Sequence, residues 1–386
     1  IEGTAEAGST VTLFVDGVTT GITTTADGTT GAYTIAPTAA LSDGAYSLTV
    51  TATDAAGNPS SSSSALSITV DTTAPATPTF TTTDTTTNDT TPIIIGTAEA
   101  GSTVELLNGD ASLGTTTADA TTGIFSITPS SELSEGLNSL TVTATDEVGN
   151  TSSASSALSI TVDTTAPAQP SITTTTSLTN DATPTIEGIA EAGSTVTLFV
   201  DGVTTGITTT ADNNGVFSIT PTLADNNYSL SVTATDAQGN TSSASSALSI
   251  TVDTTAPAQP LITTTTSLTN DATPTIEGIA EAGSTVTLFV DGVTTGITTT
   301  ADGTTGAYTI TPSISLSDGT HNLSVSATDV VGNVSVFSII LPIEIDTTAP
   351  AQPSITTTTS LTKDSTPAIE GTADSGSIIN LFIDGN

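Results

Sequence analysis

Cysteine, methionine and tryptophan are absent from this chain of 386 residues, and basic residues are almost absent. Without cysteine there are no disulfides, so redox chemistry does not indicate a compartment. Lys363 is the only base against 39 acidic residues, which gives a net charge of −38. Such a chain repels phosphate backbones and anionic lipid surfaces, so nucleic acid is excluded as an ordinary partner. No apolar run reaches the roughly 18 residues of a membrane span, so no membrane insertion is expected.

Aromatic residues are also scarce, with four tyrosines and eight phenylalanines in the whole chain. Charged residues make up only 10% of the sequence, and threonine, valine, isoleucine and alanine dominate the rest. This composition is typical of β-structure and differs from that of a disordered acidic chain. We therefore expect small β-domains with aliphatic cores.

A five-residue motif, Asp-Thr-Thr-Ala-Pro, begins at Asp71, Asp163, Asp253 and Asp346, at intervals of 92, 90 and 93 residues. A fixed period of this length is typical of tandem domains. The spacing predicts complete repeats and two part-repeats, at 1–70 (first strands missing), 71–162, 163–252, 253–345 and 346–386 (first strands only). We interpret the chain as a window on a longer repetitive protein.

The repeat at 163–252 shows period-two alternation of apolar residues and no helical period. The predicted strands are 171–173, 185–189, 195–200, 203–210, 216–220, 228–236 and a last strand through Leu248, Ile250 and Val252. Residues 178–184 have the composition of a turn. Seven short strands in about ninety residues predict an immunoglobulin-like sandwich. The fold class is thus all-β, with tandem sandwiches of about seven strands each in a linear rod.

Tyr46 and Tyr228 begin the sixth predicted strand, where immunoglobulin-like folds often have a tyrosine corner. Asn138 and His321 occupy the same position in their own repeats. We infer that this corner interaction is not needed in every copy.

Four motifs recur in the same order: D-T-T-A-P, N-D-x-T-P, E-A-G-S-x-V and A-T-D-x-x-G-N. This order resembles the bacterial Ig-like repeats of giant secreted adhesins, the biofilm-associated and RTX-like surface proteins. The resemblance covers essentially the whole chain. It implies an extracellular rod of tandem sandwiches, stiffened by Ca²⁺ at the joints, that holds an adhesive domain away from the cell. The chain departs from the pattern at Ile95, Asn108 and Lys363, which replace Glu187, Asp201 and Asn180 of the sister repeat.

Some acids recur in every copy, and strand counting places them at one end of the sandwich, beside the joint. Three carboxylates there would repel unless a cation lay between them. Oxygen ligands on flexible loops favour Ca²⁺. Asn240 or loop carbonyls could complete the shell, and Asp212 could approach. The predicted metal ligands are Asp71, Glu99, Asp146, Asp163, Glu191, Asp236, Asp253, Glu281, Asp329, Asp346 and Asp374.

The alternative is that these acids only cap turns. We favour that alternative for Asp27, Asp43 and Asp201, because Asp-Gly and related pairs are ordinary hairpin chemistry. Ile95 in place of Glu187 indicates that this glutamate belongs to a solvated face. A second ion site at the far end of the sandwich remains open but is not favoured; its acids would be Asp89, Asp181, Asp271 and Asp364.

Catalysis has little support in the sequence. His321, the only histidine, is replaced by tyrosine or asparagine in the sister repeats. No base is positioned to activate the many serines and threonines. The chain is therefore predicted not to be an enzyme.

Two functions remain. The first is a calcium-stiffened extracellular stalk of a bacterial adhesin, whose partners are neighbouring repeats of the same chain. The second is a self-assembling surface-layer, filament or biofilm-matrix component, or a glycan-binding module. Residues 196–210 and 286–300 are identical. A spacer tolerates such repetition, whereas a recognition face normally lies in one distinctive domain. The stalk is therefore favoured, with lateral self-association left open.

Overall fold

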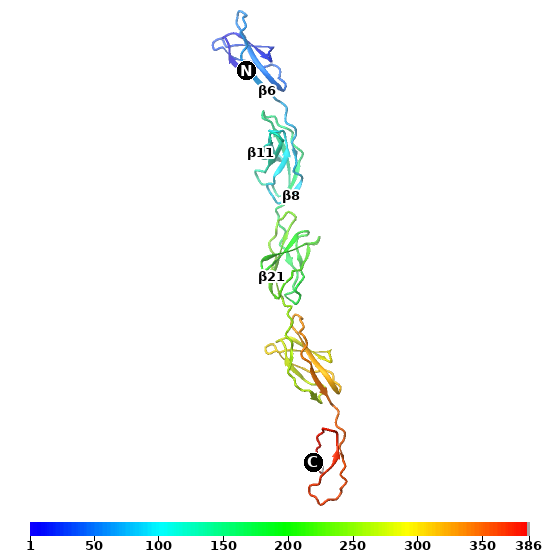
Figure 1. The fold of residues 1–386 in the computed structure, drawn as a ribbon. Helices are drawn as coiled ribbons and strands as arrows, with labels where there is room; N and C mark the ends of the chain where they lie inside the picture. Colours follow the sequence, from blue (N-terminus) through cyan, green and yellow to red (C-terminus); the bar gives the residue numbers. More distant parts are fainter. Residues whose placement is uncertain (384–386) are drawn as a thin grey trace. The chain divides into compact units, whose positions relative to one another are not determined.

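The computed structural model describes residues 1–383, and every regular element in them is a β-strand (Figure 1). Residues 384–386, at the end of the predicted final part-repeat, lie outside the described residues. No helix that could span a bilayer occurs within residues 1–383. The chain divides into two compact units, 1–166 with 236–240, and 167–235 with 241–386.

The repeat at 163–252 shows how these sequences form a sandwich. Its strands are β15 (Ser171–Ile172), β16 (Leu178–Thr179), β17 (Ile186–Ile189), β18 (Thr195–Val200), β19 (Val203–Thr210), β20 (Val216–Ile219), β21 (Asn226–Thr235) and β22 (Leu248–Val252). One sheet has the order β15-β17-β20, and the other has the order β16-β22-β21-β18-β19. The predicted all-β, immunoglobulin-like fold class is confirmed.

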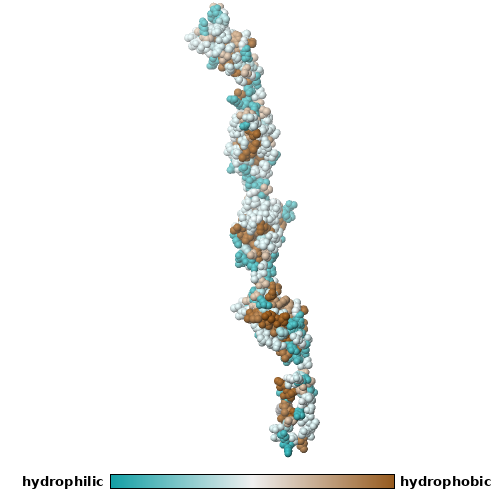
Figure 2. All heavy atoms as spheres, viewed as in Figure 1, coloured by the Kyte–Doolittle hydropathy of each residue, from teal (hydrophilic) through white to brown (hydrophobic). Residues whose placement is uncertain are grey.

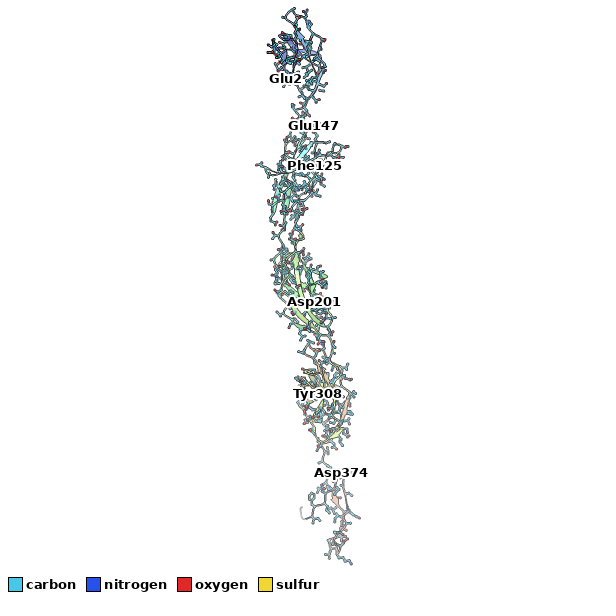
Figure 3. All side chains as sticks on the ribbon, turned by 90° about the vertical axis from the view of Figure 1, so that its left-hand side faces the viewer. Glu2, Phe125, Glu147, Asp201, Tyr308 and Asp374 are labelled. Carbon is cyan, nitrogen blue, oxygen red and sulfur yellow. The ribbon has the colours of Figure 1, made fainter. Side chains whose placement is uncertain are left out.

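Alternation along the strands builds the core between the two sheets. Val196 and Leu198 of β18 are fully buried; they lie beside Leu230 and Val232 of the neighbouring strand β21 and share one core with Phe217 of β20 in the opposite sheet. The intervening threonines point to the outer faces. Phe125 and Tyr308 occupy the place of Phe217 in the two other complete repeats, where Figure 3 labels them, and each is at most 3% exposed.

The repeat at 253–345 has the same two sheets, in the orders β23-β25-β28 and β24-β30-β29-β26-β27. Its strands are β23 (Leu261–Ile262), β24 (Leu268–Thr269), β25 (Ile276–Ile279), β26 (Thr285–Val290), β27 (Val293–Thr300), β28 (Ala307–Ile310), β29 (Gly319–Thr328) and β30 (Leu341–Ile345). The part-repeat that follows contains β31 (Ser354–Ile355) and β32 (Gly371–Thr372).

In the other unit, the repeat at 71–162 has sheets β12-β9-β7 and β11-β10-β13-β14-β8. Its strands are β7 (Thr79–Phe80), β8 (Thr85–Thr87), β9 (Ile94–Thr97), β10 (Thr103–Asn108), β11 (Ala111–Thr117), β12 (Ile124–Ile127), β13 (Gly136–Thr145) and β14 (Leu158–Val162). The first part-repeat contains β1 (Glu2–Thr4), β2 (Thr10–Val15), β3 (Val18–Thr25), β4 (Ala32–Thr34), β5 (Gly44–Thr53) and β6 (Leu66–Val70), in sheets β1-β4 and β3-β2-β5-β6.

The segment predicted as a turn, 178–184, begins with a strand, so this prediction is wrong at its start. Leu178 and Thr179 form β16, which pairs in parallel with Thr251 and Val252 of β22. Each complete repeat therefore has eight strands rather than seven. A two-residue strand has no periodicity, and its partner lies about seventy residues away, so composition showed only the turn that follows it.

The tyrosine corner is present, and it is not limited to the tyrosine repeats. The hydroxyl groups of Tyr46 and Tyr228 donate to the carbonyls of Ser42 (2.8 Å) and Ala224 (3.1 Å). In the sister repeats Asn138 Nδ2 donates to the Ser134 carbonyl (2.8 Å), and His321 Nε2 bonds the Ser317 carbonyl (3.0 Å). The inference that two copies dispense with this interaction is wrong, because asparagine and histidine also carry an N–H that reaches the same carbonyl.

A serine-rich segment lies along the edge of each long strand and completes its ladder. Ser245 donates its backbone N–H to the Val232 carbonyl (2.8 Å), and its Oγ accepts the Val232 N–H (3.0 Å). Ser242 bonds Ala234 in the same way, at 2.8 and 2.9 Å. The corresponding serines are Ser60, Ser63, Ser152, Ser155, Ser335 and Ser338. The segment thus satisfies buried amides without being a regular strand.

Candidate functional site

The joint between two repeats is the Asp-Thr-Thr-Ala-Pro segment, which follows the last strand of one repeat directly. Asp253 begins the joint after β22, and its N–H donates to the Thr179 carbonyl beside β16 (2.9 Å). Its carboxylate Oδ1 accepts the Thr255 N–H (3.1 Å) and so closes a local turn. Asp71, Asp163 and Asp346 accept the matching threonine N–H in their own joints. The joint aspartates therefore cap the start of the linker.

An acid from the preceding repeat holds the two threonines of each joint. Asp225 Oδ1 accepts the N–H and hydroxyl of Thr254 at 2.9 and 2.7 Å, and its Oδ2 accepts the Thr255 hydroxyl at 2.5 Å. Asp43, Glu135 and Asp318 hold the equivalent threonine pairs. We call this arrangement the upstream clamp.

Hydrogen bonds to the upstream clamp favour the charged carboxylate. The bonds from the threonine hydroxyls, above all that of Thr255, lower the pKa of Asp225 below its ordinary value. The pKa values of Asp43, Glu135 and Asp318 are lowered in the same way, chiefly by hydroxyl groups of their threonines. Charge-assisted bonds of this kind are stronger than neutral ones.

An asparagine from the following repeat holds the other side of the joint. Asn240 Nδ2 donates to the Asp163 carbonyl (2.8 Å), and Asn333 Nδ2 donates to the Asp253 carbonyl (2.8 Å). Asn150 donates to the Asp71 carbonyl in the same manner (3.1 Å). We call this arrangement the downstream clamp. The joint is therefore held by side chains from the repeats on both of its sides.

The aspartate of A-T-D-x-x-G-N positions the clamping asparagine. Asp329 Oδ1 accepts the N–H groups of Val331, Gly332 and Asn333 at 2.8 to 2.9 Å, and its Oδ2 accepts Asn333 Nδ2 at 2.7 Å. Asp54, Asp146 and Asp236 organise their own loops with their asparagines in the same way. Desolvation raises the pKa of Asp329, but the bonds from Asn333 and the loop outweigh it, so the pKa is lowered overall.

The carboxylates of the E-A-G motif are not part of these clamps. Glu99, Glu191 and Glu281 are exposed, and their backbone carbonyls accept the hydroxyl and N–H of a serine three residues later. Asp374, labelled in Figure 3, differs, because its Oδ2 accepts the Ala351 N–H of the joint (2.6 Å). In the first part-repeat, Glu6, Asp54 and Asn58 line one open hollow.

The predicted convergence of three carboxylates is not found within residues 1–383, where no three Asp, Glu, His or Cys side chains could together hold a metal ion. Asp236 and Asp163 do approach one joint, but they meet through the Asn240 amide. Both oxygens of Asp236 accept N–H groups, and the Asn240 nitrogen faces Asp163. This donor set does not fit a three-carboxylate calcium cage. Calcium binding stays a prediction.

The turn-capping interpretation is confirmed for two acids and wrong for a third. Asp27 accepts the N–H groups of Thr29 and Thr30, and Asp201, at φ +52°, caps a hairpin and accepts the Ser229 N–H. Asp43 instead forms an upstream clamp. A signal was available in the sequence, since an acid recurs 29 residues before the first threonine of every joint.

The acids at the far end of the sandwich each cap their own turn. Asp89, Asp181, Asp271 and Asp364 accept the N–H of a threonine two residues later at 2.7 to 2.9 Å. Asn180, in the same turn as Asp181, lies against Gly332 of the loop that carries Asn333. These turns therefore border the next joint, as strand counting indicated.

The profile of the family described as "Bacterial Ig-like domain" matches the chain four times, at residues 1–72, 76–164, 168–254 and 262–347. No curated protein sequence matches the chain. Solved structures that resemble it include fibronectin(III)-like modules of Clostridium thermocellum CbhA, at 19% identity over 46% of this chain and 94% of that one, with a TM-score of 0.30.

Two further structures are similar at low scores. Chicken CNTN1 FN1-FN3 domains are 11% identical over 71% of this chain and 99% of that one, with a TM-score of 0.29. The BSP domain of a biofilm associated protein is 13% identical over 80% of this chain and 76% of that one, with a TM-score of 0.20. Scores this low carry no functional argument. The four family matches cover most of the sequence, and the chain therefore belongs to the bacterial Ig-like domain family.

Proposed function

We propose that this chain is a spacer segment of a bacterial extracellular adhesin, in which each joint is clamped from both sides to restrict bending between domains. The observation that carries the proposal is the repetition of the same two clamps. Asp43, Glu135, Asp225 and Asp318 hold the threonines, and Asn150, Asn240 and Asn333 hold the joint carbonyls.

The four tandem matches to one domain family support this proposal, since repetition of one domain lengthens a chain, whereas a specific recognition site normally lies in one distinctive domain. No base that could activate a nucleophile recurs in the repeats, whereas the residues that hold the joints do recur. A side chain that is held by two or three hydrogen bonds restricts the backbone dihedrals of a linker that would otherwise be free. Extracellular localisation follows from the adhesin role and is part of the proposal.

Distance measurement between neighbouring domains tests the role of the clamps. The chain has no cysteine, so exposed Thr208 and Thr298 can be replaced by cysteine and spin-labelled on either side of the Asp253 joint. We expect Asn333→Ala to broaden the distance distribution measured by double electron–electron resonance. Asn322→Ala, an exposed position on β29 outside the joint, should leave the distribution unchanged. Equal widths in the three proteins would rule out the downstream clamp as a source of stiffness.

Calcium at the joints remains the second element of the proposal. The exposed carboxylates of Glu99, Glu191 and Glu281 are not used by the clamps and could contribute to ion binding together with joint aspartates. Titration calorimetry with Ca²⁺ measures the binding directly, and the same spin-labelled pair can be measured with and without chelator. If no heat of binding is measured and chelator does not change the distance distribution, calcium is not part of the joints. The hydrogen-bonded clamps would then be the only source of stiffness in the proposal.

A further inference from the structure

The repeat at 253–345 differs from its sisters along the serine-rich edge segment. Residues 334–340 have the sequence V-S-V-F-S-I-I, whereas the sisters have P-S-S-S-S-S-A, T-S-S-A-S-S-A and T-S-S-A-S-S-A. The two serines whose Oγ atoms accept N–H groups of the long strand are retained as Ser335 and Ser338. The remaining five positions of the segment are all large apolar residues. We call these five residues, Val334, Val336, Phe337, Ile339 and Ile340, the apolar ridge.

Hydrogen bonds hold the backbone of the apolar ridge in place. The Oγ atoms of Ser335 and Ser338 accept the N–H groups of Ala327 (2.9 Å) and Val325 (3.0 Å) on β29. Gln259, in the preceding joint region, donates Nε2 to the Phe337 carbonyl (2.6 Å). Phe337 also packs edge-on against Phe289 of β26, with ring centroids 4.8 Å apart. The ridge is therefore preorganised, which lowers the entropic cost of binding.

The ridge side chains nevertheless face solvent. Val336 is 67% exposed, Phe337 is 54% exposed and Ile339 is 77% exposed, with Val334 and Ile340 also more than half exposed. Apolar side chains gather on the surface of this repeat, shown in brown in Figure 2. Five exposed apolar residues within one seven-residue segment form a cluster of the kind that marks an interaction surface, whereas singly scattered ones are normal.

The negative charge of this repeat indicates what kind of partner would bind the apolar ridge. Residues 253–345 contain no lysine or arginine, and their acids include Asp329 in the loop before the ridge and Glu344 in the strand after it. A second copy of the same ridge would bring two negative surfaces together. A segment with apolar side chains flanked by basic ones would instead gain both burial and charge attraction.

We propose that the apolar ridge is a docking surface for a segment of a different protein in which apolar side chains are interleaved with lysine or arginine. The ridge supplies the apolar contact, and the acidic surroundings attract the basic side chains and exclude acidic competitors. The fourth repeat is then a specific binding module within an otherwise uniform spacer.

The experiment measures binding of synthetic peptides to the whole chain by fluorescence anisotropy. The probes are a labelled peptide of alternating leucine and lysine, a matched leucine–glutamate peptide, and a matched serine–lysine peptide. The test variant carries Val336→Ser, Phe337→Ala and Ile339→Ser, which are the residues of the sister repeat at 163–252. Ser335 and Ser338 remain, so the edge hydrogen bonds are kept.

We expect the leucine–lysine peptide to bind the native chain, and the triple variant to bind it at least about tenfold more weakly. The other two peptides should bind weakly to both. Equal affinity of both proteins for the leucine–lysine peptide would show attraction by general charge and overturn the proposal, as would absence of saturable binding.

Sedimentation of the native chain and the triple variant tests the other possible occupant, a second copy of this chain. A native dimer that dissociates in the variant would assign the ridge to a second copy, against the proposal. Circular dichroism checks that the variant is folded. If the variant is not folded, Ile339→Ser alone replaces it, because this side chain is 77% exposed, and a single change should still weaken peptide binding measurably.

Discussion

Replacing one serine of the serine-rich edge segment should show how these small sandwiches satisfy their buried amides. Ser245 is 8% exposed, and its Oγ is the acceptor for the N–H of Val232, a residue with no exposed surface. In Ser245→Ala the backbone bond from residue 245 to the Val232 carbonyl can remain, but the Val232 N–H loses its acceptor. An unsatisfied buried donor costs about 1–3 kcal/mol.

Hydrogen exchange followed by mass spectrometry is the appropriate assay, because it resolves one repeat within the whole chain. From the loss of about 1–3 kcal/mol in stability, we expect hydrogen exchange of peptides containing Val232 to become roughly 5- to 150-fold faster under native conditions. Ser243→Ala is the matched control, since Ser243 is exposed and contributes only its carbonyl, which Ala keeps. Its effect should stay within about 0.5 kcal/mol.

Equal exchange in Ser245→Ala and Ser243→Ala would refute the reasoning. It would mean that water reaches the Val232 amide, so that the side chain does not complete the ladder. The same change at Ser155 or Ser338 should have the same effect in its own repeat, because each of these serines makes the corresponding bond.

Three further predictions concern single residues. Both nitrogens of His321 face acceptors, the Asp291 carboxylate and the Ser317 carbonyl, and the bond to Asp291 is the first cause that raises the pKa of His321. This stabilisation is complete below the unfolded pKa of about 6.5 and is lost as pH rises through the raised folded value. The protection of residues 253–345 against hydrogen exchange, taken as the observed rate relative to the intrinsic rate at the same pH, should therefore fall as pH rises above about 6.5. His321→Tyr should abolish that fall, and an unchanged protection profile in the variant would contradict the prediction. Gly278→Ala would drive a Cβ into Tyr308 and the Leu261 carbonyl, and should lower the free energy of unfolding measured in urea by about 1–3 kcal/mol. A Cβ at Gly303 meets nothing within 4 Å, so Gly303→Ala should leave that free energy unchanged. The Thr254 amide resonance should titrate with Asp225 at a midpoint below the ordinary aspartate pKa of about 3.9, so that the upstream clamp is lost as pH falls through that midpoint; a midpoint at or above 3.9, or titration that persists in Asp225→Asn, would count against the clamp.

The sequence by itself determined the repeat, the β-class and most strands, because these depend on neighbours along the chain. Val196 and Leu198 alternate with polar residues, and Asp201-Gly202 favours a tight turn whatever the rest of the protein does. The recurring residues also predicted where the joints lie.

Tertiary structure decided which groups meet at those joints. Asn333 and Asp253 are 80 residues apart, and Asp225 and Thr254 are 29 apart, so only the folded chain shows that an amide and a clamp carboxylate hold the linker. Recurrence marked Asp236 as important, but a recurring carboxylate can serve an ion or a ring of N–H donors equally well. The folded structure shows the ring of N–H donors around Asp236, which the sequence could not show, because hydrogen bonding depends on distance and direction that no local pattern encodes.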